Sequence, residues 1–462
     1  MKHGLCKTVE GAAPAGPDDA PRPHLGGSMN AGQAPPDRHP RLRRLSERSQ
    51  SIEEYCRSIA EAAPTAPAPA SRQLLATVAR QLADQVPGLA RAGLEQDLRR
   101  PHTVVSLAEH HASIAHPLTM SAIATQALYS GLSGSPLISF TCATVPLDND
   151  LFPRGTMIAG RKVAFLPQRH RAKSPLTCPA MNTEDMSGKL RQLERAGLID
   201  AATSAAVAQW WSRIAPEVAA CRLYWQQVSL LNQRIFQGVF ALEAAPLVML
   251  PIELIARDML LADLDRGRYG WLDRSLFDPA ARTALLRSLD GIRCCWNADA
   301  SRGTFLFWSV DEANRLRPVF PRGDELTTRD GRAVCRIEPA AIHAALTREA
   351  LVPAGSYALI RIAVQCRLRH FGGSLQYDYL SHIKRRLVSG LGAFLTEDEL
   401  RGIDQAPDSY YVDFAEHEAL GGDLGRLKNP ISKADLASFG AASIGEAARR
   451  ALDWIATSVT RY

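Results

Sequence analysis

The stretch that decides the fold spans residues 103–155 and reads TVVSLAEHHASIAHPLTMSAIATQALYSGLSGSPLISFTCATVPLDNDLFPRG. Residues 103–107 are apolar and β-branched, as in a fully buried strand. Pro117 suits a first helical turn, and the apolar spacing predicts a helix over residues 117–132, ended by Gly131 and Gly134. Residues 137–145 predict a second strand. Two strands joined by such a helix indicate a right-handed parallel crossover and an α/β fold.

Polar side chains follow both predicted strands. The carboxyl ends of neighbouring parallel strands meet at one edge of a sheet, where open α/β folds bind their ligands. Histidine moves protons well near neutral pH, so a histidine cluster at this edge predicts acid–base catalysis, although one histidine alone is more often structural. The predicted catalytic residues are Glu109, His110, His111 and His116, facing Asp148 and Asp150 across one crevice.

Catalytic or substrate-binding roles can be assigned to some of these residues, and a structural role or a metal site is the alternative. His110 or His111 is predicted to be the general base, and Asp148 to hold a substrate ammonium group or to orient a histidine. Loop solvation and helix capping are the ordinary roles of such aspartates. A zinc or iron site built from the histidines and one aspartate is the main rival. Adjacent residues of an extended chain point in opposite directions, so His110 and His111 would rarely share an ion, and we predict no metal.

Cations follow a third predicted strand, over residues 162–166. They include Arg169 and His170, and Arg154 lies in the loop before that strand. These side chains could bind an acidic substrate or could simply be solvated, as loop charges commonly are.

A Gly-Gly pair marks a second region of interest. Residues 357–364 predict a strand, residues 370–374 a loop with Gly372 and Gly373, and residues 375–388 a helix. Free amides at a helix start bind anions, although Gly-Gly also suits a plain turn. The predicted substrate-binding residues are therefore Asp148, Asp150, Arg154, Arg169, His170, Gly372, Gly373, Gln376 and Tyr377.

The order of these motifs resembles that of the bacillithiol-type cysteine ligases over roughly residues 100–390. In that family a Gly-Gln-Gln loop ends the first strand and Gly-Pro-Leu starts the helix, where this chain has Glu109-His110-His111 and His116-Pro117-Leu118. Asp148-Asn149-Asp150 and Gly372-Gly373-Ser374 take the places of its acidic cluster and its Gly-Gly helix start. The resemblance implies a Rossmann-like parallel sheet with helical, partly coiled-coil insertions. It also implies an enzyme that joins cysteine to a glucosaminyl malate acceptor.

Composition divides the chain into five parts. Residues 1–70 predict a disordered arm and linker rich in Pro, Ala and Arg, in which residues 51–62 look helical. Residues 71–181 and 246–400 supply the two parts of the α/β core. Residues 182–245 predict a helical insertion that could form a coiled coil, and residues 401–462 a helical C-terminal region. The arm carries a basic patch, interpreted as solvated or as a partner-binding arm, that consists of Arg38, Arg41, Arg43, Arg44 and Arg48.

Charge and cysteine usage narrow the class of protein. The 462 residues carry a net charge of +6, without the basic and aromatic alternation typical of nucleic-acid binding, so no nucleic-acid partner is predicted. The most apolar run, residues 244–256, is too short to span a bilayer, so no membrane partner is predicted. The nine cysteines have no CxxC spacing, and the first residues lack a signal-peptide core. We therefore expect reduced thiols and a cytoplasmic protein.

These observations predict a biosynthetic enzyme of the ligase or transferase type. It would join an amino acid or similar nucleophile to a second small substrate, and its partners would be small molecules that include an amino acid or an anionic group. The sequence names no cofactor and leaves open whether the chain forms a homodimer. Two alternatives stay open: a metal-dependent hydrolase or oxygenase that uses the same histidines, and a non-enzymatic interaction or effector protein that uses the basic arm.

Overall fold

A five-stranded parallel sheet contains the two strands predicted from residues 103–155. In chain order its strands are β1 (Val105–Ser106), β2 (Ile138–Thr141), β5 (Val248–Pro251), β11 (His370–Gly372) and β12 (Tyr410–Tyr411). Across the sheet the order is β12-β11-β1-β2-β5, and every neighbouring pair is parallel. The chain thus adds strands outward from β1, first on one side and then on the other, so the strand order reverses between β1 and β11.

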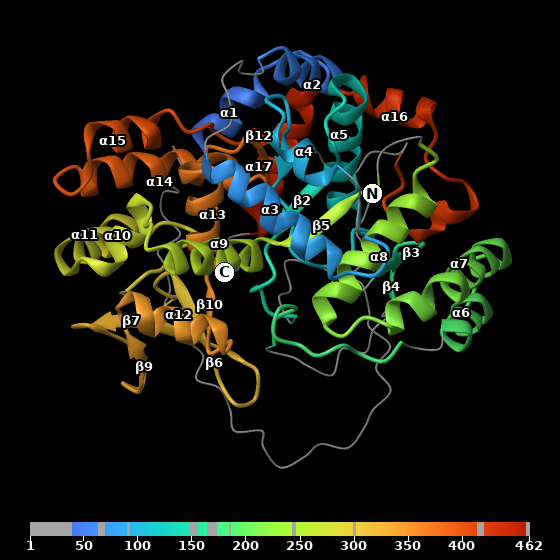
Figure 1. Ribbon diagram of the computed structural model, residues 1–462. Coiled ribbons are helices and arrows are strands. Elements are labelled where there is room, and N and C mark those ends of the chain that lie inside the picture. The colour runs from blue at the N-terminus through green and yellow to red at the C-terminus, as the bar shows by residue number, and fades with distance from the viewer. Residues whose placement is uncertain are drawn as a thin grey trace. The chain divides into compact units, whose positions relative to one another are not determined.

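The computed structural model describes residues 39–62, 70–89, 93–147, 156–163, 173–183, 186–242, 246–298, 302–413 and 420–458 (Figure 1). The parallel connection of the predicted crossover is confirmed, because helix α5 (Pro117–Ser133) connects the parallel neighbours β1 and β2. Gly134, with φ of 66°, ends α5 in the left-handed conformation, whereas the helix continues through Gly131. The predicted strand over residues 162–166 corresponds to β4 (Arg161–Val163), and its last residues lie outside the described part. It pairs antiparallel with β3 (Thr156–Ile158).

A second, antiparallel sheet has the order β10-β6-β7-β8-β9. Its strands are β6 (Phe307–Val310), β7 (Leu316–Arg322), β8 (Glu325–Thr328), β9 (Ala333–Arg336) and β10 (Leu351–Pro353). Helix α12 (Pro339–Thr347) connects β9 to β10 and packs on both strands (Figure 1).

Most of the remaining helices fall into four groups along the chain. The first group is α1 (Pro40–Ser46), α2 (Ile52–Glu61), α3 (Ala70–Asp84) and α4 (Leu94–Arg99). The predicted helical stretch before β5 holds α6 (Met186–Arg195), α7 (Ala201–Ala219) and α8 (Tyr224–Val239). After β5 come α9 (Ile252–Arg266), α10 (Trp271–Phe277) and α11 (Pro279–Leu289). The C-terminal group is α14 (Gln376–Leu391), α15 (Glu397–Asp404), the 3-10 helix η2 (Leu424–Lys428), α16 (Lys433–Gly440) and α17 (Ile444–Ser458). Among the described helices, none has the length and apolar character needed to cross a membrane.

One hydrophobic cluster joins these elements, from Leu42 in α1 to Ile455 in α17. Helices α3 and α9 lie together in front of the parallel sheet in Figure 1, and both contact β5. Helix α5 packs against α2 and is buried on most of its surface, polar residues included. Polar side chains inside such a helix must find hydrogen-bond partners within the protein.

Residues 357–364 are helical, so the strand predicted there is wrong. They lie in α13 (Gly355–Leu359) and in a π-helix, η1 (Ile360–Gln365). A short apolar run has the same appearance in a buried strand and in a buried helix, so periodicity could not separate the two. Within this segment the buried Arg361 donates to Asp273 Oδ2 at 2.5 Å and also binds Asp263. These partners lie in α10 and α9, far away in the sequence, so a local pattern could not predict that Arg361 would be buried.

Residues 39–50 are ordered, so the disordered arm and linker predicted for residues 1–70 is wrong over this part. Residues 1–38 and 63–69 lie outside the described residues. Helix α1 starts with proline, and it buries Leu42 and Leu45. Helix α2 follows Ser51 through a capping box in which Glu54 N donates to Ser51 Oγ at 3.1 Å and Ser51 N donates to Glu54 Oε2 at 2.8 Å. This capping box agrees with the helix predicted over residues 51–62.

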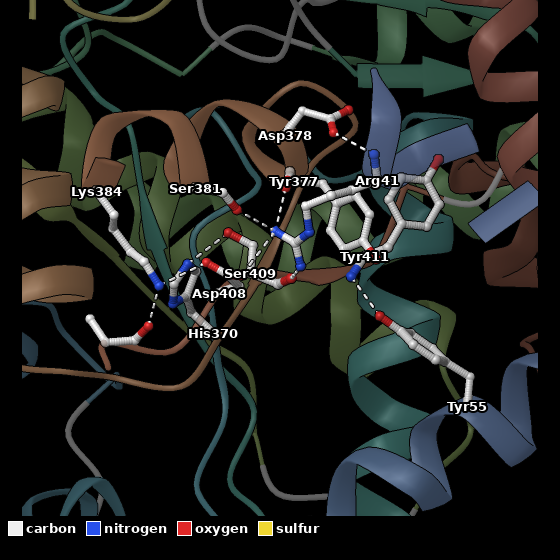
Figure 2. A network of polar contacts seen from close by, with 11 residues as sticks. Arg41, Tyr55, His370, Tyr377, Asp378, Ser381, Lys384, Asp408, Ser409 and Tyr411 are labelled. Carbon is white, nitrogen blue, oxygen red and sulfur yellow. Dashed lines mark hydrogen bonds and ion pairs between the residues drawn. The ribbon is translucent and has the colours of Figure 1, made fainter. Parts of the chain in front are cut away.

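Arg41 anchors α1 to α14 and to the segment before β12. Its guanidinium donates to the Tyr377 carbonyl at 2.6 Å, the Ser381 hydroxyl at 3.0 Å and the Ser409 carbonyl at 3.2 Å (Figure 2). It also lies over the Tyr377 ring, 4.1 Å from the ring centroid. This arginine is therefore a structural anchor, not a member of a solvated basic patch.

Further contacts hold the same region together (Figure 2). The Tyr411 amide donates to the Tyr55 hydroxyl at 2.8 Å, which connects β12 to α2. Lys384 of α14 pairs with Asp408 at 2.9 Å, just before β12. Helix α14 and strand β12 are thus fixed to each other and to the N-terminal helices.

We predict that Arg41→Ala lowers the free energy of unfolding by about 2–3 kcal/mol, because charged hydrogen bonds and a cation–π contact are lost together. Arg43→Ala is the matched control, since Arg43 lies in the same helix and is exposed. It should change stability by no more than about 0.5 kcal/mol. Urea unfolding of both variants measures the difference, and equal losses would contradict the anchoring role.

Candidate functional site

The carboxyl ends of β1, β11 and β12 bring three polar residues to the edge where the strand order reverses. Glu109 follows β1, Ser374 follows β11 and Asp413 follows β12. A reversal of strand order leaves a crevice between the loops of the two strands, and ligands of open α/β sheets bind there. This edge is the candidate site.

Glu109 is a buried carboxyl at this edge, and its side chain is held on both oxygens. The Ser106 hydroxyl donates to Oε2 at 2.6 Å, and Gln126 Nε2 donates to Oε1 at 2.9 Å. Burial raises the pKa of Glu109 from 4.5 to about 7, and the charge of Asp413 adds to the increase. A carboxyl that titrates near neutral pH can take up and release protons in a reaction.

Gln126 fixes the position of Glu109 from inside α5. The Ser139 hydroxyl of β2 donates to Gln126 Oε1 at 3.2 Å, so the amide nitrogen is left to donate to Glu109. Ser106, Glu109, Gln126 and Ser139 therefore form one chain of hydrogen bonds between β1, α5 and β2. All four side chains are buried.

Asp413 is a second buried carboxyl, and it is bonded to the start of α14. Ser374 donates to Asp413 Oδ2 through its amide at 2.6 Å and through its hydroxyl at 3.1 Å. Burial raises the pKa of Asp413, whereas the bonds from Ser374 lower it. An internal carboxylate thus lies just before the start of α14, where an external anion was predicted to bind.

Close packing explains the Gly-Gly pair. A Cβ atom on Gly373 would lie 2.7 Å from Asp413 Oδ2, and one on Gly372 would lie 2.8 Å from Ser409 Cβ. Neither glycine has a positive φ. The pair is needed because β12 approaches β11 closely, and Gly372 is the last residue of β11 where a loop was predicted.

His111 is buried, and both of its ring nitrogens are bonded to protein. Nε2 lies 2.8 Å from the Trp225 carbonyl, which can only accept, and Nδ1 lies 2.6 Å from the Thr141 hydroxyl. Burial lowers the pKa of His111 to about 4. The neutral ring therefore donates from Nε2 and accepts at Nδ1, and no ring nitrogen is left for a substrate.

His110 and His116 are both half-buried. Burial lowers the pKa of His110 to about 4, so this ring is neutral at physiological pH. The backbone of His110 continues the pairing of β1 with β2 as a parallel bridge to Cys142. His116 precedes α5 with extended backbone and makes no capping bond through its side chain, and Pro117 takes the first helical position as predicted.

Helix α8 holds the histidine-rich loop through Asn232. Its Oδ1 accepts from the Ile114 amide at 3.0 Å, and its Nδ2 donates to the Ala112 carbonyl at 2.8 Å. A side-chain amide used in this way replaces a paired backbone segment. Together with the bond between His111 and the Trp225 carbonyl, Asn232 ties the loop to α8 over more than one turn of the helix.

Gln376 and Tyr377 lie in the first turn of α14, beside the Gly-Gly pair. Gln376 is 5% exposed, and no described residue accepts a hydrogen bond from its Nε2. The Arg41 guanidinium lies over the face of the Tyr377 ring. The Tyr377 and Tyr411 rings pack edge-to-face, with their centroids 5.6 Å apart. Gln376 therefore keeps a donor for a ligand, whereas Tyr377 mainly supports α14.

The structure brings together only part of the predicted site. Glu109, Gly372, Gly373, Gln376 and Tyr377 lie at the ends of the adjacent strands β1 and β11 or in α14. The remaining predicted substrate contacts lie outside the described residues: Asp148, Asp150, Arg154, Arg169 and His170. Among the described residues, no group of three or more His, Cys, Asp or Glu side chains is placed to hold a metal ion.

Sequence reasoning missed Gln126, Asn232 and Asp413. Gln126 could have been noticed as an amide in a helix that is otherwise apolar on most sides. Asp413 lies close after β12, and its position beside Ser374 depends on the pairing of β12 with β11, which a local pattern does not show. Asn232 gives no local signal, because its partners lie more than a hundred residues earlier in the chain.

Comparisons with known proteins add no assignment: no protein-family model matches the chain, and no curated protein matches it. What the site can do is therefore inferred from its own chemistry. Two buried carboxyls with raised pKa values follow β1 and β12, the strands on either side of β11, and one of them titrates near neutral pH. Such a pair can act in general acid–base catalysis.

We predict that Glu109 makes stability fall as the pH rises from about 5 to about 8. The folded protein keeps this carboxyl protonated up to a pKa of about 7, whereas the unfolded chain releases the proton near 4.5. The folded state therefore binds more protons in this window and loses up to about 3 kcal/mol across it.

Glu109→Gln should remove this pH-dependent loss. The free energy of unfolding of the variant should therefore rise relative to that of the wild type between pH 5 and pH 8. Urea unfolding at both values measures the gain. Glu47→Gln, at an exposed glutamate, is the control and should show no such change. If Glu109→Gln and Glu47→Gln behave alike, then Glu109 titrates like an ordinary glutamate.

We also predict that Gly373→Ala lowers the free energy of unfolding by about 1–3 kcal/mol, because its Cβ would overlap Asp413 Oδ2. Gly402→Ala is the control, since that glycine lies in α15 with open space around its Cβ position. It should be neutral or stabilising by up to about 1 kcal/mol. In an Asp413→Ala background Gly373→Ala should cost less, and an unchanged cost would place the strain elsewhere.

Proposed function

We propose that this chain is a biosynthetic enzyme with a Rossmann-like core, which joins an amino acid or similar nucleophile to a second small substrate. The strand order supports the Rossmann-like assignment. Read as β5-β2-β1-β11-β12, it places side by side the third, second, first, fourth and fifth strands of this sheet, counted along the chain. The likeness to the bacillithiol-type cysteine ligases belongs to the same proposal.

The observation that carries the proposal is the buried carboxyl of Glu109 at the strand reversal, with a pKa of about 7. We assign the role of general base to Glu109, because His111 has both ring nitrogens bonded and His110 is a weak base. Ionised Glu109 accepts the proton that an amine or thiol loses as it attacks the electrophilic atom of the second substrate, and the bond from that atom to its leaving group breaks, so that the leaving group departs with the electron pair. The nearby charge of Asp413 increases the basicity of Glu109.

We propose substrate contacts from one described residue near this carboxyl and from residues outside the described part of the chain. Gln376 offers an amide donor to a carbonyl or carboxylate oxygen. Asp148 and Asp150 remain the proposed partners of a substrate ammonium group. Arg154, Arg169 and His170 remain the proposed partners of an anionic group.

The cysteines support a cytoplasmic location as part of the proposal. All eight described cysteines are free thiols, and only one of them is exposed. Reduced cysteines are usual where glutathione and thioredoxin keep thiols reduced.

A ligand screen followed by turnover assays tests the proposal. Thermal shift with the twenty amino acids, mono- and dicarboxylates, and ATP should find at least one stabilising compound, since a ligand that binds the folded state raises its stability. Pairs of such compounds are then assayed for a joined product by mass spectrometry. The rate should rise with pH through about 7, because the base must be ionised.

Glu109→Gln should keep the thermal shift and lose turnover by about 10²-fold or more, as expected when a general base is removed. Glu47→Gln should retain both. Full turnover in Glu109→Gln would remove Glu109 from the mechanism. A chain that binds none of these compounds would contradict the proposed function as a whole.

A further inference from the structure

Cys294 and Cys295 are adjacent in a closed turn between α11 and β6. The Gly291 amide donates to the Trp296 carbonyl at 2.9 Å, and the Cys295 amide donates to the Ile292 carbonyl at 3.1 Å. Gly303, with φ of 70°, packs so closely against this turn that a Cβ there would lie 2.3 Å from the Cys295 carbonyl oxygen. The backbone around the two cysteines is therefore fixed from both sides.

The two thiols differ in access to solvent. Cys294 has φ of 69°, a left-handed conformation that is uncommon for a residue with a side chain, and it is the exposed cysteine among those described. Cys295 is 9% exposed. A hydrogen bond with the Cys294 thiol raises the pKa of Cys295 well above its usual range, and burial adds to this. A reagent in solvent can thus reach the Cys294 thiol, and the Cys295 thiol lies directly beside it.

The turn also contacts α14. Burial raises the pKa of the Tyr379 hydroxyl well above its usual range, and the charge and hydrogen bond of the Cys294 thiol add to the increase. Tyr379 lies one turn after Gln376 in the same helix. A chemical change at Cys294 would therefore alter the contacts of α14, the helix that borders the candidate site.

We infer that Cys294 and Cys295 form a redox-modification site, which a peroxide converts to a vicinal disulfide. The Cys294 sulfur attacks one peroxide oxygen, the O–O bond breaks, and a sulfenic acid and one water form. The Cys295 sulfur then attacks the Cys294 sulfur, the S–O bond breaks, and a second water leaves. Two thiols are oxidised and one hydrogen peroxide is reduced to two waters.

The expected disulfide is strained and easily reduced. Consecutive Cα atoms lie about 3.8 Å apart, whereas disulfide-bonded cysteines usually have Cα atoms about 4.4–6.8 Å apart. Strained and exposed disulfides have the higher reduction potentials typical of labile or regulatory bonds. Formation of the disulfide also removes the Cys294 thiol from Tyr379, so α14 should loosen on oxidation. This inference does not depend on the proposed function.

Peptide mapping of the full chain tests the inference. Arg293 and Arg302 flank the pair, so trypsin releases residues 294–302, CCWNADASR, which contain no other cysteine. After hydrogen peroxide and alkylation of the remaining thiols, most of this peptide should carry no alkyl group and weigh about 2 Da less than the dithiol form, since the disulfide has lost two hydrogens. Dithiothreitol should reverse the change.

Cys294→Ser and Cys295→Ser should each abolish the disulfide, and Cys335→Ser, at a half-buried single thiol, should leave it intact. Hydrogen exchange over residues 376–391 should increase on oxidation in the wild type and stay unchanged in Cys295→Ser. Three outcomes would overturn the inference: a sulfinic acid at Cys294 with Cys295 still alkylated, a disulfide from Cys294 to another cysteine, or an unreactive pair.

Discussion

The central strand of the parallel sheet is very short, and side-chain hydrogen bonds at its carboxyl end keep it in place. Strand β1 has two residues, and its regular pairing with β2 is limited to Ser106 and Ser139. Past this point the chain of side-chain bonds from Ser106 through Glu109 and Gln126 to Ser139 adds to the single backbone bridge between His110 and Cys142. Because Glu109 must be buried to make these bonds, the same contacts that complete the sheet also raise the pKa of its carboxyl.

Burial has the opposite effect on the histidines next to Glu109. Loss of water disfavours the charged form of every group, so it makes a carboxylate a stronger base and an imidazole a weaker one. The pKa of Glu109 rises to about 7, whereas the pKa values of His110 and His111 fall to about 4. A buried strand end therefore favours a carboxylate as the proton acceptor. This is why a histidine-rich stretch contributes mainly structural contacts, with His111 joining β2 to α8.

Local patterns predicted the parts of the fold that depend on local chemistry. Strands β1 and β2, helix α5 and the ending of α5 at Gly134 follow from apolar spacing, Pro117 and a glycine. The helical state of residues 357–364 did not follow, because the partners of Arg361 come from α9 and α10. Of the candidate site, Glu109 and the Gly-Gly pair were predicted by position. Asp413 was missed, since its role appears only when β12 pairs with β11.

Helix α14 connects the site to distant parts of the chain. Its first turn receives Arg41 from α1, its start is bonded to Asp413 after β12, and its next turn meets the thiols of the turn after α11 through Tyr379. Three separate segments therefore determine where Gln376 and the Gly-Gly pair lie relative to β1. A shift of α14 would change the packing of Gly373 against Asp413, and with it the charge near Glu109. The pKa of Glu109, the proposed base, thus depends on the burial of its own carboxyl. It also depends on the contacts that hold α14, the helix that follows β11.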